Sequence, residues 1–107
     1  YGPLTVASVH ALHPDKAFIC PGALVPSRGL MTNYEQMAEV KMAFLHAARE
    51  TVALVDAAKI DARGLIRFAG MEDVGSIVMD RDPKGAVTQA VAELPEGTTR
   101  PQIIIAG

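Results

Sequence analysis

The chain has 107 residues, half of them hydrophobic and 21% charged, which suits one globular domain and excludes a disordered chain. Its net charge of -2 provides no basic surface for nucleic acid. No apolar run approaches the roughly 20 residues of a membrane span, no signal peptide is visible, and the single cysteine, Cys20, suggests a reducing, cytoplasmic compartment.

The first half of the sequence predicts two helices and one strand. A helix is expected over residues 3–13, because Pro3 suits a first helical turn and Pro14 ends the element. Residues 17–20 form a short apolar run that predicts a buried strand, and residues 26–29 have the composition of a turn. Residues 34–49 predict a helix with one apolar stripe, made of Met37, Val40, Phe44, Ala47 and Ala48.

The second half alternates apolar strands with a helix. Residues 51–55 are rich in β-branched side chains without polar alternation, which predicts a parallel strand buried on both faces. Residues 76–79 and 103–105 predict two more strands, and residues 84–94 predict a helix. The sequence therefore predicts an α/β fold with a mostly parallel sheet flanked by helices.

The ends of the predicted strands carry most of the candidate binding residues. Gly22 follows the first strand, Asp56 and Lys59 follow the second, and Asp80 follows the third. Open parallel sheets bind ligands beyond the carboxyl ends of their strands, so we expect a site at this rim.

Asp56 and Lys59 are the sharpest pair at that rim. An aspartate at the end of a buried strand can accept hydrogen bonds from sugar hydroxyls, and a lysine three residues later can face a phosphate. The ordinary alternative is a helix cap at Asp56 and a surface lysine, and spacing alone favours it.

Four further residues are weaker candidates. Gly29 and Thr32 lie in an expected loop before the long helix, where free N–H groups attract anions, although an ordinary turn with a Thr32 or Asn33 cap is the better interpretation of these residues alone. Glu39 and Lys41 lie early in that helix, and a solvated glutamate with a lysine at the edge of the stripe is the simpler interpretation.

The sequence gives little support for a metal site, a cofactor or a catalytic residue. His10 and His13 have a spacing that can suit a metal, but no third ligand is in sight. Cys20 has no histidine partner in a nucleophile arrangement, and a small residue at a strand end is the simpler interpretation. We therefore expect no metal, no cofactor and no enzymatic activity.

Five motifs resemble the C-terminal sensor domain of DeoR-family transcriptional regulators. Residues 15–19 are similar to the family's Asp-Lys-x-Phe strand, and residues 29–33 to its Gly-Leu-Thr-Thr loop. Residues 38–41 are similar to its Glu-x-Lys helix start. Residues 54–59 and 77–80 follow in the family's order and are similar to its Asp-Ser-Ser-Lys signature and its Ile-Thr-Asp strand end. Ala57 and Ala58 replace the two serines of the signature. Cys20 and Ala23 stand where the family commonly has glycine.

The resemblance implies a fold shared with ribose-phosphate isomerases and CoA transferases. It implies a phosphorylated sugar or related metabolite as effector, self-association into a homo-oligomer, and control of operator DNA binding by an attached helix-turn-helix domain. The effector contacts that it suggests are Gly22, Gly29, Thr32, Glu39, Lys41, Asp56 and Lys59.

The resemblance also suggests how the chain fits into a longer protein. The sequence begins without an initiator methionine, and we expect residues 1–107 to be the C-terminal part of the sensor. The helix-turn-helix domain and the first half of the sensor, with its phosphate-binding loop, would then lie elsewhere.

Two other functions stay open. One is a sugar-phosphate isomerase of the same fold, with Glu39 or Asp56 as acid–base carboxylate, although residues 22–29 lack a glycine-dense, Asp-containing loop. The other is a phosphoacceptor domain with a strand-end aspartate, which ranks last because Cys20 stands where such domains place acidic residues.

Overall fold

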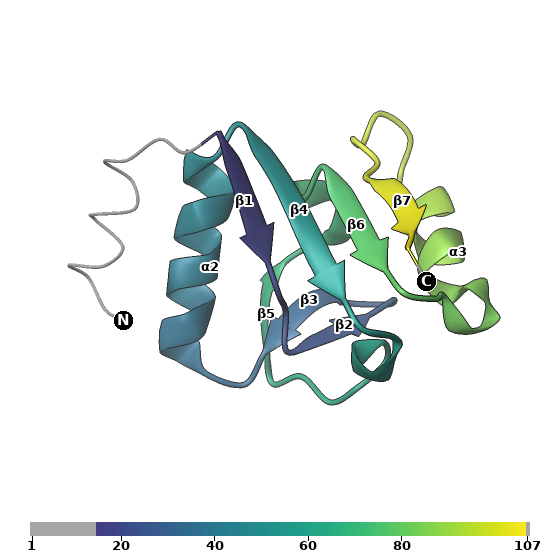
Figure 1. Ribbon diagram of the computed structural model, residues 1–107, viewed down its shortest axis with the longest axis horizontal. Coiled ribbons are helices and arrows are strands. Elements are labelled where there is room, and N and C mark those ends of the chain that lie inside the picture. The colour runs from purple at the N-terminus through teal and green to yellow at the C-terminus, as the bar shows by residue number, and fades with distance from the viewer. Residues whose placement is uncertain (1–14, 107) are drawn as a thin grey trace.

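The computed structural model describes residues 15–106, so the predicted helix over residues 3–13 and the His10/His13 pair lie outside the described residues. A four-stranded parallel sheet runs through the molecule (Figure 1). Its strands lie in the order β1-β4-β6-β7 and span Lys16–Ile19, Glu50–Val55, Ser76–Met79 and Gln102–Ile105. The prediction of an α/β fold with a mainly parallel sheet is confirmed.

A second, antiparallel sheet was not predicted from the sequence. Its three strands lie in the order β2-β3-β5 and span Ala23–Val25, Gly29–Thr32 and Ile66–Ala69. Residues 26–28 form the predicted turn, here between β2 and β3. The placement of Gly29 and Thr32 in a loop was wrong: both belong to β3, and all four residues of that strand are buried.

Two α-helices and three short 3-10 helices complete the fold of residues 15–106. Helix α2 spans Glu35–Ala47 and α3 spans Ala86–Ala92, while η1, η2 and η3 span Ala57–Lys59, Met71–Asp73 and Pro83–Gly85. Among the described residues no helix is long and apolar enough to cross a membrane.

The two predicted helices that lie within residues 15–106 both need a correction. Helix α3 begins at Ala86 rather than at Lys84, because Lys84 and Gly85 have positive φ angles of 59° and 64°. The five residues of the apolar stripe expected on α2 are only half-buried. The fully buried residues of this helix are instead Ala38, Ala43 and Leu45.

The core lies on one face of the parallel sheet. There Ile19, Ala53 and Ile77 pack with side chains from the second sheet and from both helices, and in Figure 1 α2 and the second sheet lie behind the strands. The main contributors from the other elements are Leu24, Leu30, Phe68, Ala38, Leu45, Val87 and Val91. Burial of this apolar surface is the main stabilising term of the fold.

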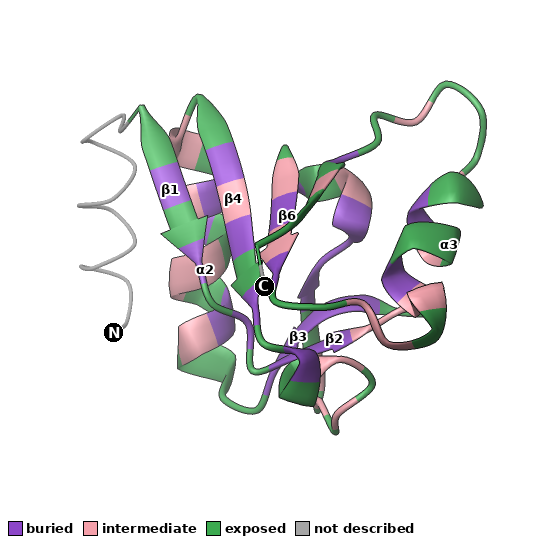
Figure 2. Ribbon diagram, turned by 45° about the vertical axis from the view of Figure 1, so that its right-hand side comes forward, coloured by how far each residue is buried: buried purple, intermediate pink, exposed green. Residues whose placement is uncertain are grey.

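The opposite face of the parallel sheet, here called the outer face, is largely uncovered by the described residues. Its apolar side chains include Phe18, Leu54 and Ile104, which are 62%, 39% and 38% exposed. Figure 2 shows the resulting alternation of buried and exposed positions along β1 and β4. The expectation that residues 51–55 are buried on both faces was therefore wrong for residues 15–106.

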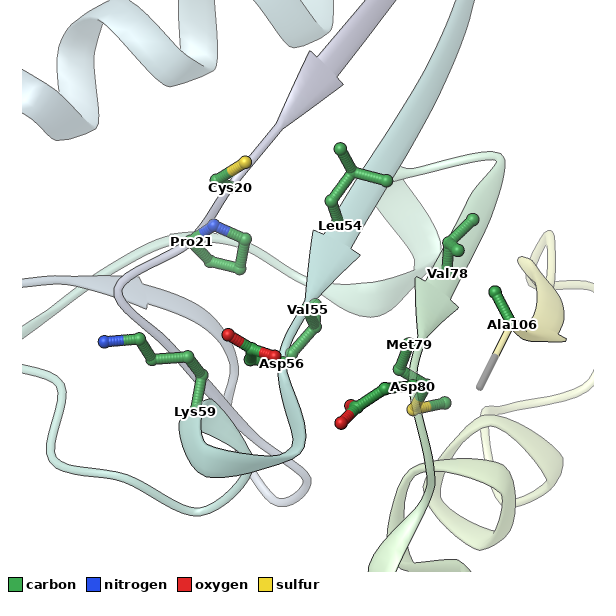
Figure 3. Close-up of a pocket in the computed structure, with 10 residues that line it drawn as sticks. All are labelled: Cys20, Pro21, Leu54, Val55, Asp56, Lys59, Val78, Met79, Asp80 and Ala106. Carbon is green, nitrogen blue, oxygen red and sulfur yellow. The ribbon is translucent and has the colours of Figure 1, made fainter.

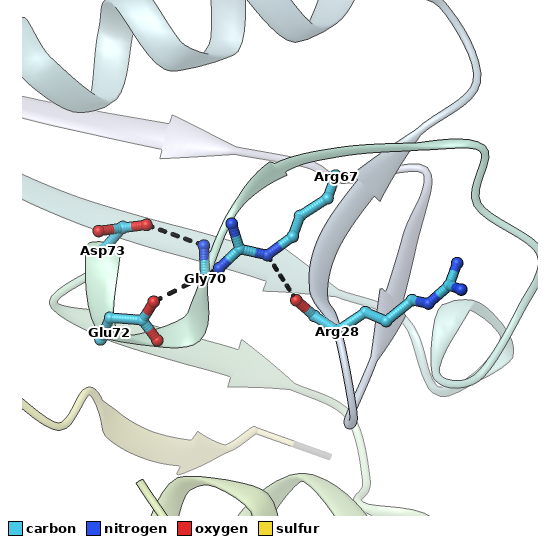
Figure 4. Close-up of polar contacts among 5 residues, drawn as sticks. All are labelled: Arg28, Arg67, Gly70, Glu72 and Asp73. Carbon is cyan, nitrogen blue, oxygen red and sulfur yellow. Dashed lines mark hydrogen bonds and ion pairs between the residues drawn. The ribbon is translucent and has the colours of Figure 1, made fainter. Parts of the chain in front are cut away.

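The second sheet is held by polar contacts at its edge (Figure 4). Arg67 of β5 donates from Nε to the carbonyl of Arg28 at 2.7 Å and approaches Glu72 at 3.5 Å. The N–H of Gly70 donates to the Asp73 carboxylate at 2.8 Å, which caps η2. The bond between Arg67 and Arg28 fixes the β2–β3 turn against β5.

Candidate functional site

A cavity of about 400 Å³ opens at the carboxyl ends of β1, β4 and β6 (Figure 3). These strands are parallel, so their ends bring the residues that follow them to one rim. Polar and apolar side chains mix in its lining, which consists of Cys20, Pro21, Leu54, Val55, Asp56, Lys59, Val78, Met79, Asp80 and Ala106. Its position agrees with the rule for ligand sites in open parallel sheets.

A larger cavity, of about 510 Å³, lies at the opposite rim among the amino ends of β4, β6 and β7. Its charged lining residues include Glu50, Glu72 and Asp73, all three of which belong to ion pairs or caps. Because strand amino ends are not where open parallel sheets place ligands, position outweighs size here. We take the rim with Asp56 as the candidate site.

Asp56 is held in an extended conformation directly after β4, with φ -70° and ψ 143°. It occupies the N-cap position of η1, yet its side chain accepts no capping hydrogen bond. Within residues 15–106 it forms no ion pair, with Lys59 or with any other cation. The structure therefore does not support the ordinary interpretation of Asp56 as a helix cap.

Lys59 ends η1 and lines the same cavity, as the spacing of the two residues predicted. Its side chain is exposed, and in Figure 3 it extends away from Asp56. The backbone of this turn is fixed at its far end, because the N–H of Asp61 donates to the carbonyl of Leu24 at 2.7 Å. Lys59 thus projects an exposed cation from a fixed backbone.

Asp80 is a lining residue that we did not include among the expected effector contacts. One of its carboxylate oxygens accepts the N–H of Ala57 at 2.7 Å, a contact between the loops after β6 and β4. A signal was present in the sequence, since residues 54–56 and 78–80 both end an apolar run with an aspartate. The pairing of Val55 with Met79 makes these two aspartates neighbours.

Gly22, Gly29 and Thr32 do not line this cavity. The N–H of Gly22 donates to the carbonyl of Met31 at 2.9 Å, which ties the end of β1 to β3. Gly29 is buried with a φ of 117°, and an added Cβ atom would lie 2.5 Å from the carbonyl oxygen of Ala69. Thr32 is only 4% exposed in the second sheet. The expected grouping of Gly22 and Thr32 with Asp56 is corrected accordingly.

Glu39 and Lys41, two residues apart on α2, have different surroundings. Glu39 is exposed and does not line the cavity. The Lys41 ammonium donates to the carbonyl of Cys20 at 2.8 Å and lies 5.3 Å from the centre of the Phe68 ring. Burial lowers the pKa of Lys41, and the nearby Cys20 partly opposes this shift. Lys41 thus supports the cavity wall at Cys20 from outside.

The chemistry of the lining favours hydroxyl groups. The cavity presents two carboxylates, Asp56 and Asp80, and one ammonium, Lys59. Carboxylates are strong hydrogen-bond acceptors for hydroxyl donors, whereas they repel phosphate. Apolar side chains such as Leu54 and Val78 offer a surface for the carbon skeleton of a polyol. The lining therefore offers hydrogen-bond acceptors, an apolar surface and one cation, Lys59, at the same rim.

The fold and the rim define an α/β domain with a ligand cavity at strand carboxyl ends. Residues 1–81 match the family described as the DeoR C terminal sensor domain. This match covers more than two-thirds of the chain, including Asp56, Lys59 and Asp80. The chain therefore belongs to the DeoR C-terminal sensor family, which confirms the resemblance.

Two curated relatives are similar over most of the chain. The HTH-type transcriptional repressor GlcR of Bacillus subtilis is 25% identical over 87 residues, which are 80% of this chain and 33% of that protein. The HTH-type transcriptional regulator GlpR of Haloferax volcanii is 24% identical over 103 residues, which are 92% of this chain and 40% of that protein. The chain thus spans about a third to two-fifths of the length of these relatives.

Proposed function

We propose that this chain is the effector-sensing portion of a DNA-binding transcriptional repressor and works in the cytoplasm without enzymatic activity. In this proposal the cavity at Asp56 binds the sugar end of a phosphorylated sugar or related metabolite. Binding then changes how an attached helix-turn-helix domain holds operator DNA. Family membership supports the regulatory part of the proposal. Both relatives are named as HTH-type regulators.

One observation carries the choice of ligand. Asp56 is fixed by a strand of the parallel sheet, lines a cavity, and keeps its carboxylate free of capping and ion-pair partners within residues 15–106. A rigid backbone with an unengaged acceptor is what a hydroxyl-binding site requires. The two carboxylates also imply that most phosphate contacts come from outside this lining. We therefore propose that the chain supplies the sugar-binding part of a larger pocket.

A titration of the ¹⁵N-labelled chain tests this proposal. The probes are ribose 5-phosphate, glucose 6-phosphate and glycerol 3-phosphate, with ribose, glucose, glycerol and inorganic phosphate as matched controls. We expect at least one phosphorylated probe to shift the amide signals of Ala57, Lys59 and Asp80 more than those of Thr51 and Gly75 at the opposite rim. Uniform or absent shifts with every probe, both in the chain and in the intact regulator, would contradict the proposal.

A turnover assay addresses the isomerase alternative. Glu39, one of its two expected acid–base groups, does not line the cavity, which leaves Asp56 as the carboxylate named for that role. We expect no interconversion of ribose 5-phosphate and its ketose isomer by the intact protein. Turnover by the intact protein that disappears in Asp56→Asn would mean that the protein is an isomerase and would contradict the proposal.

A further inference from the structure

Two aspartates leave the parallel sheet side by side, but they are used differently. Val55 pairs with Met79 in the sheet, so Asp56 and Asp80 are neighbours just beyond it. Asp80 accepts the N–H of Ala57 at 2.7 Å, whereas Asp56 caps nothing in η1. An aspartate at an N-cap position ordinarily bonds the N–H groups of its own helix. Here the bonded carboxylate comes from the neighbouring strand.

The bond to Asp80 acts on one peptide unit. The N–H of Ala57 belongs to the peptide plane that joins Asp56 to Ala57. The carbonyl oxygen of that same plane, on Asp56, accepts the N–H of Lys59 at 2.8 Å. The plane is therefore held at both its donor and its acceptor. Because the orientation of this plane defines the ψ angle of Asp56, the two bonds fix ψ at 143°.

Fixing that angle sets the direction of the Asp56 Cα–Cβ bond relative to the held Asp56–Ala57 peptide. In Figure 3 the Asp56 carboxylate lies toward Pro21, while the Asp80 carboxylate approaches the turn from the other side. Like charges repel across a shared cavity, so Asp80 also disfavours rotation of the Asp56 carboxylate toward β6. Both effects keep the Asp56 acceptor open to the cavity.

We propose that Asp80 is the positioning residue of this site: it holds the Ala57 N–H and thereby presents the Asp56 carboxylate to a hydroxyl-bearing ligand. The part of this inference that concerns a ligand rests on the proposed function. The part that concerns the Asp56–Ala57 peptide does not, and it is tested without any ligand.

The ligand-free test is hydrogen exchange in Asp80→Ala and Asp80→Asn. Loss of the acceptor exposes the Ala57 amide, so we expect its exchange to speed up about tenfold in Asp80→Ala. Asparagine retains a carbonyl acceptor at the same place, so Asp80→Asn retains most of the protection. Asp73→Ala is the matched control, because it removes a similar bond of 2.8 Å, to Gly70, outside the cavity. An Ala57 exchange rate equal in Asp80→Ala and the unaltered chain would overturn the inference.

The ligand-bound test is a double-mutant cycle on affinity for whichever of ribose 5-phosphate, glucose 6-phosphate or glycerol 3-phosphate binds. Alone, Asp80→Ala should weaken binding about tenfold, the loss of roughly one charge-assisted hydrogen bond. In an Asp56→Asn background the same change should cost little more, because Asp80 acts through Asp56. Asp73→Ala should leave affinity unchanged.

The two arms separate the possible failures. Equal losses from Asp80→Ala in both backgrounds would show a general structural role and overturn the positioning role. If no phosphorylated probe binds the chain or the intact regulator, the proposed function fails. The amide exchange of Ala57 then still decides whether Asp80 holds the peptide plane.

Discussion

The β2–β3 hairpin and the loop after β4 both contain residues that the family resemblance suggests as effector contacts, yet they are built in opposite ways. In the hairpin, Gly29 and Thr32 are buried and serve packing. In the loop, Asp56 and Lys59 are exposed and line a cavity. A residue in a family motif can thus serve the packing beneath a site just as well as it can line the site. Burial and hydrogen bonding distinguish the two roles.

The largest effect should come from the hairpin. In Gly29→Ala, the new Cβ atom would meet the Ala69 carbonyl oxygen at 2.5 Å, on a backbone with a φ of 117°. Strain of this kind together with overpacking costs about 2–4 kcal/mol. We expect a loss of that size in the free energy of unfolding, measured by denaturant titration.

Gly22→Ala is the matched control for that change. Its Cβ atom would lie 3.5 Å from the Met31 carbonyl oxygen, an ordinary contact. The free energy of unfolding should change by less than about 1 kcal/mol. Equal losses in the two variants would mean that the two glycines do not differ structurally as described.

The next effect concerns the loop and should appear in binding rather than in stability. Asp56→Asn keeps the shape of a side chain that caps nothing but removes its charge. A lost charge-assisted hydrogen bond costs roughly 1.5–3 kcal/mol, so effector affinity should fall about tenfold to a hundredfold. Under the proposed function, added ligand should then no longer release operator DNA from the intact protein. Calorimetry measures the affinity.

Glu39→Gln is the control for Asp56→Asn, because Glu39 is an exposed carboxylate outside the cavity. It should leave affinity unchanged. The contradicting outcome is an Asp56→Asn variant that folds normally and binds the effector as well as the unaltered protein does. The loop after β4 would then contribute no more to ligand binding than the hairpin.

A smaller effect is expected from the loop after β6, where an aspartate bonds the first turn of the following helix α3. Asp82 accepts the N–H groups of Val87 and Thr88 and the Thr88 hydroxyl. Burial alone would raise the pKa of Asp82, but these hydrogen bonds outweigh it and lower the pKa below 3.8. Since the folded pKa is the lower one, this stabilisation is present above the unfolded pKa and is lost as pH falls through the folded pKa.

Replacing Asp82 should destabilise the folded chain more at neutral pH than at acidic pH. Asp82→Ala should lower the free energy of unfolding by about 1 kcal/mol at neutral pH, the usual value of such a cap. The difference from the unaltered chain should shrink as the pH falls below about 4, because the unfolded chain then takes up a proton at Asp82 more readily than the folded chain does. Denaturant titrations at pH 7 and pH 3 measure it. A difference that is equal at both pH values would exclude the charged cap.

The smallest effect should concern association. The outer face exposes Phe18, Leu54 and Ile104, and uncovered apolar sheet surface favours contact between copies. We expect light scattering to show a concentration-dependent increase in mass that Phe18→Lys reduces. Leu65→Lys is the control, because Leu65 is 75% exposed but lies outside the sheets. A monomer at high concentration would contradict the prediction.

The sequence predicted the parallel sheet well because its strands are continuous apolar runs. Residues 51–55 and 76–79 fall within β4 and β6 as observed. The second sheet escaped prediction because β2 and β3 have only three and four residues and show no polar alternation. A hairpin of this kind is stabilised by tertiary contacts, such as the bond from Arg67 to Arg28, which local patterns do not reveal.

The same distinction applies to the candidate site. The rule for strand ends located Asp56 and Lys59 in the sequence because both lie close to one strand. The bond between Asp80 and Ala57 joins residues 23 positions apart, so it depends on the register of β4 and β6. Lys41 likewise reaches Cys20 across 21 positions. Spacing in the sequence does not predict such contacts.

The uncovered face of the parallel sheet bears directly on the cavity. The segments that connect β1, β4, β6 and β7 pack on the core side of the sheet. Within residues 15–106 no segment therefore covers the outer face. Leu54 and Val78 belong to that open side and also line the cavity. Any polypeptide that covered the sheet there would close the cavity from above and shield its carboxylates from water. Shielding strengthens hydrogen bonds to those carboxylates, so assembly and ligand affinity would rise together.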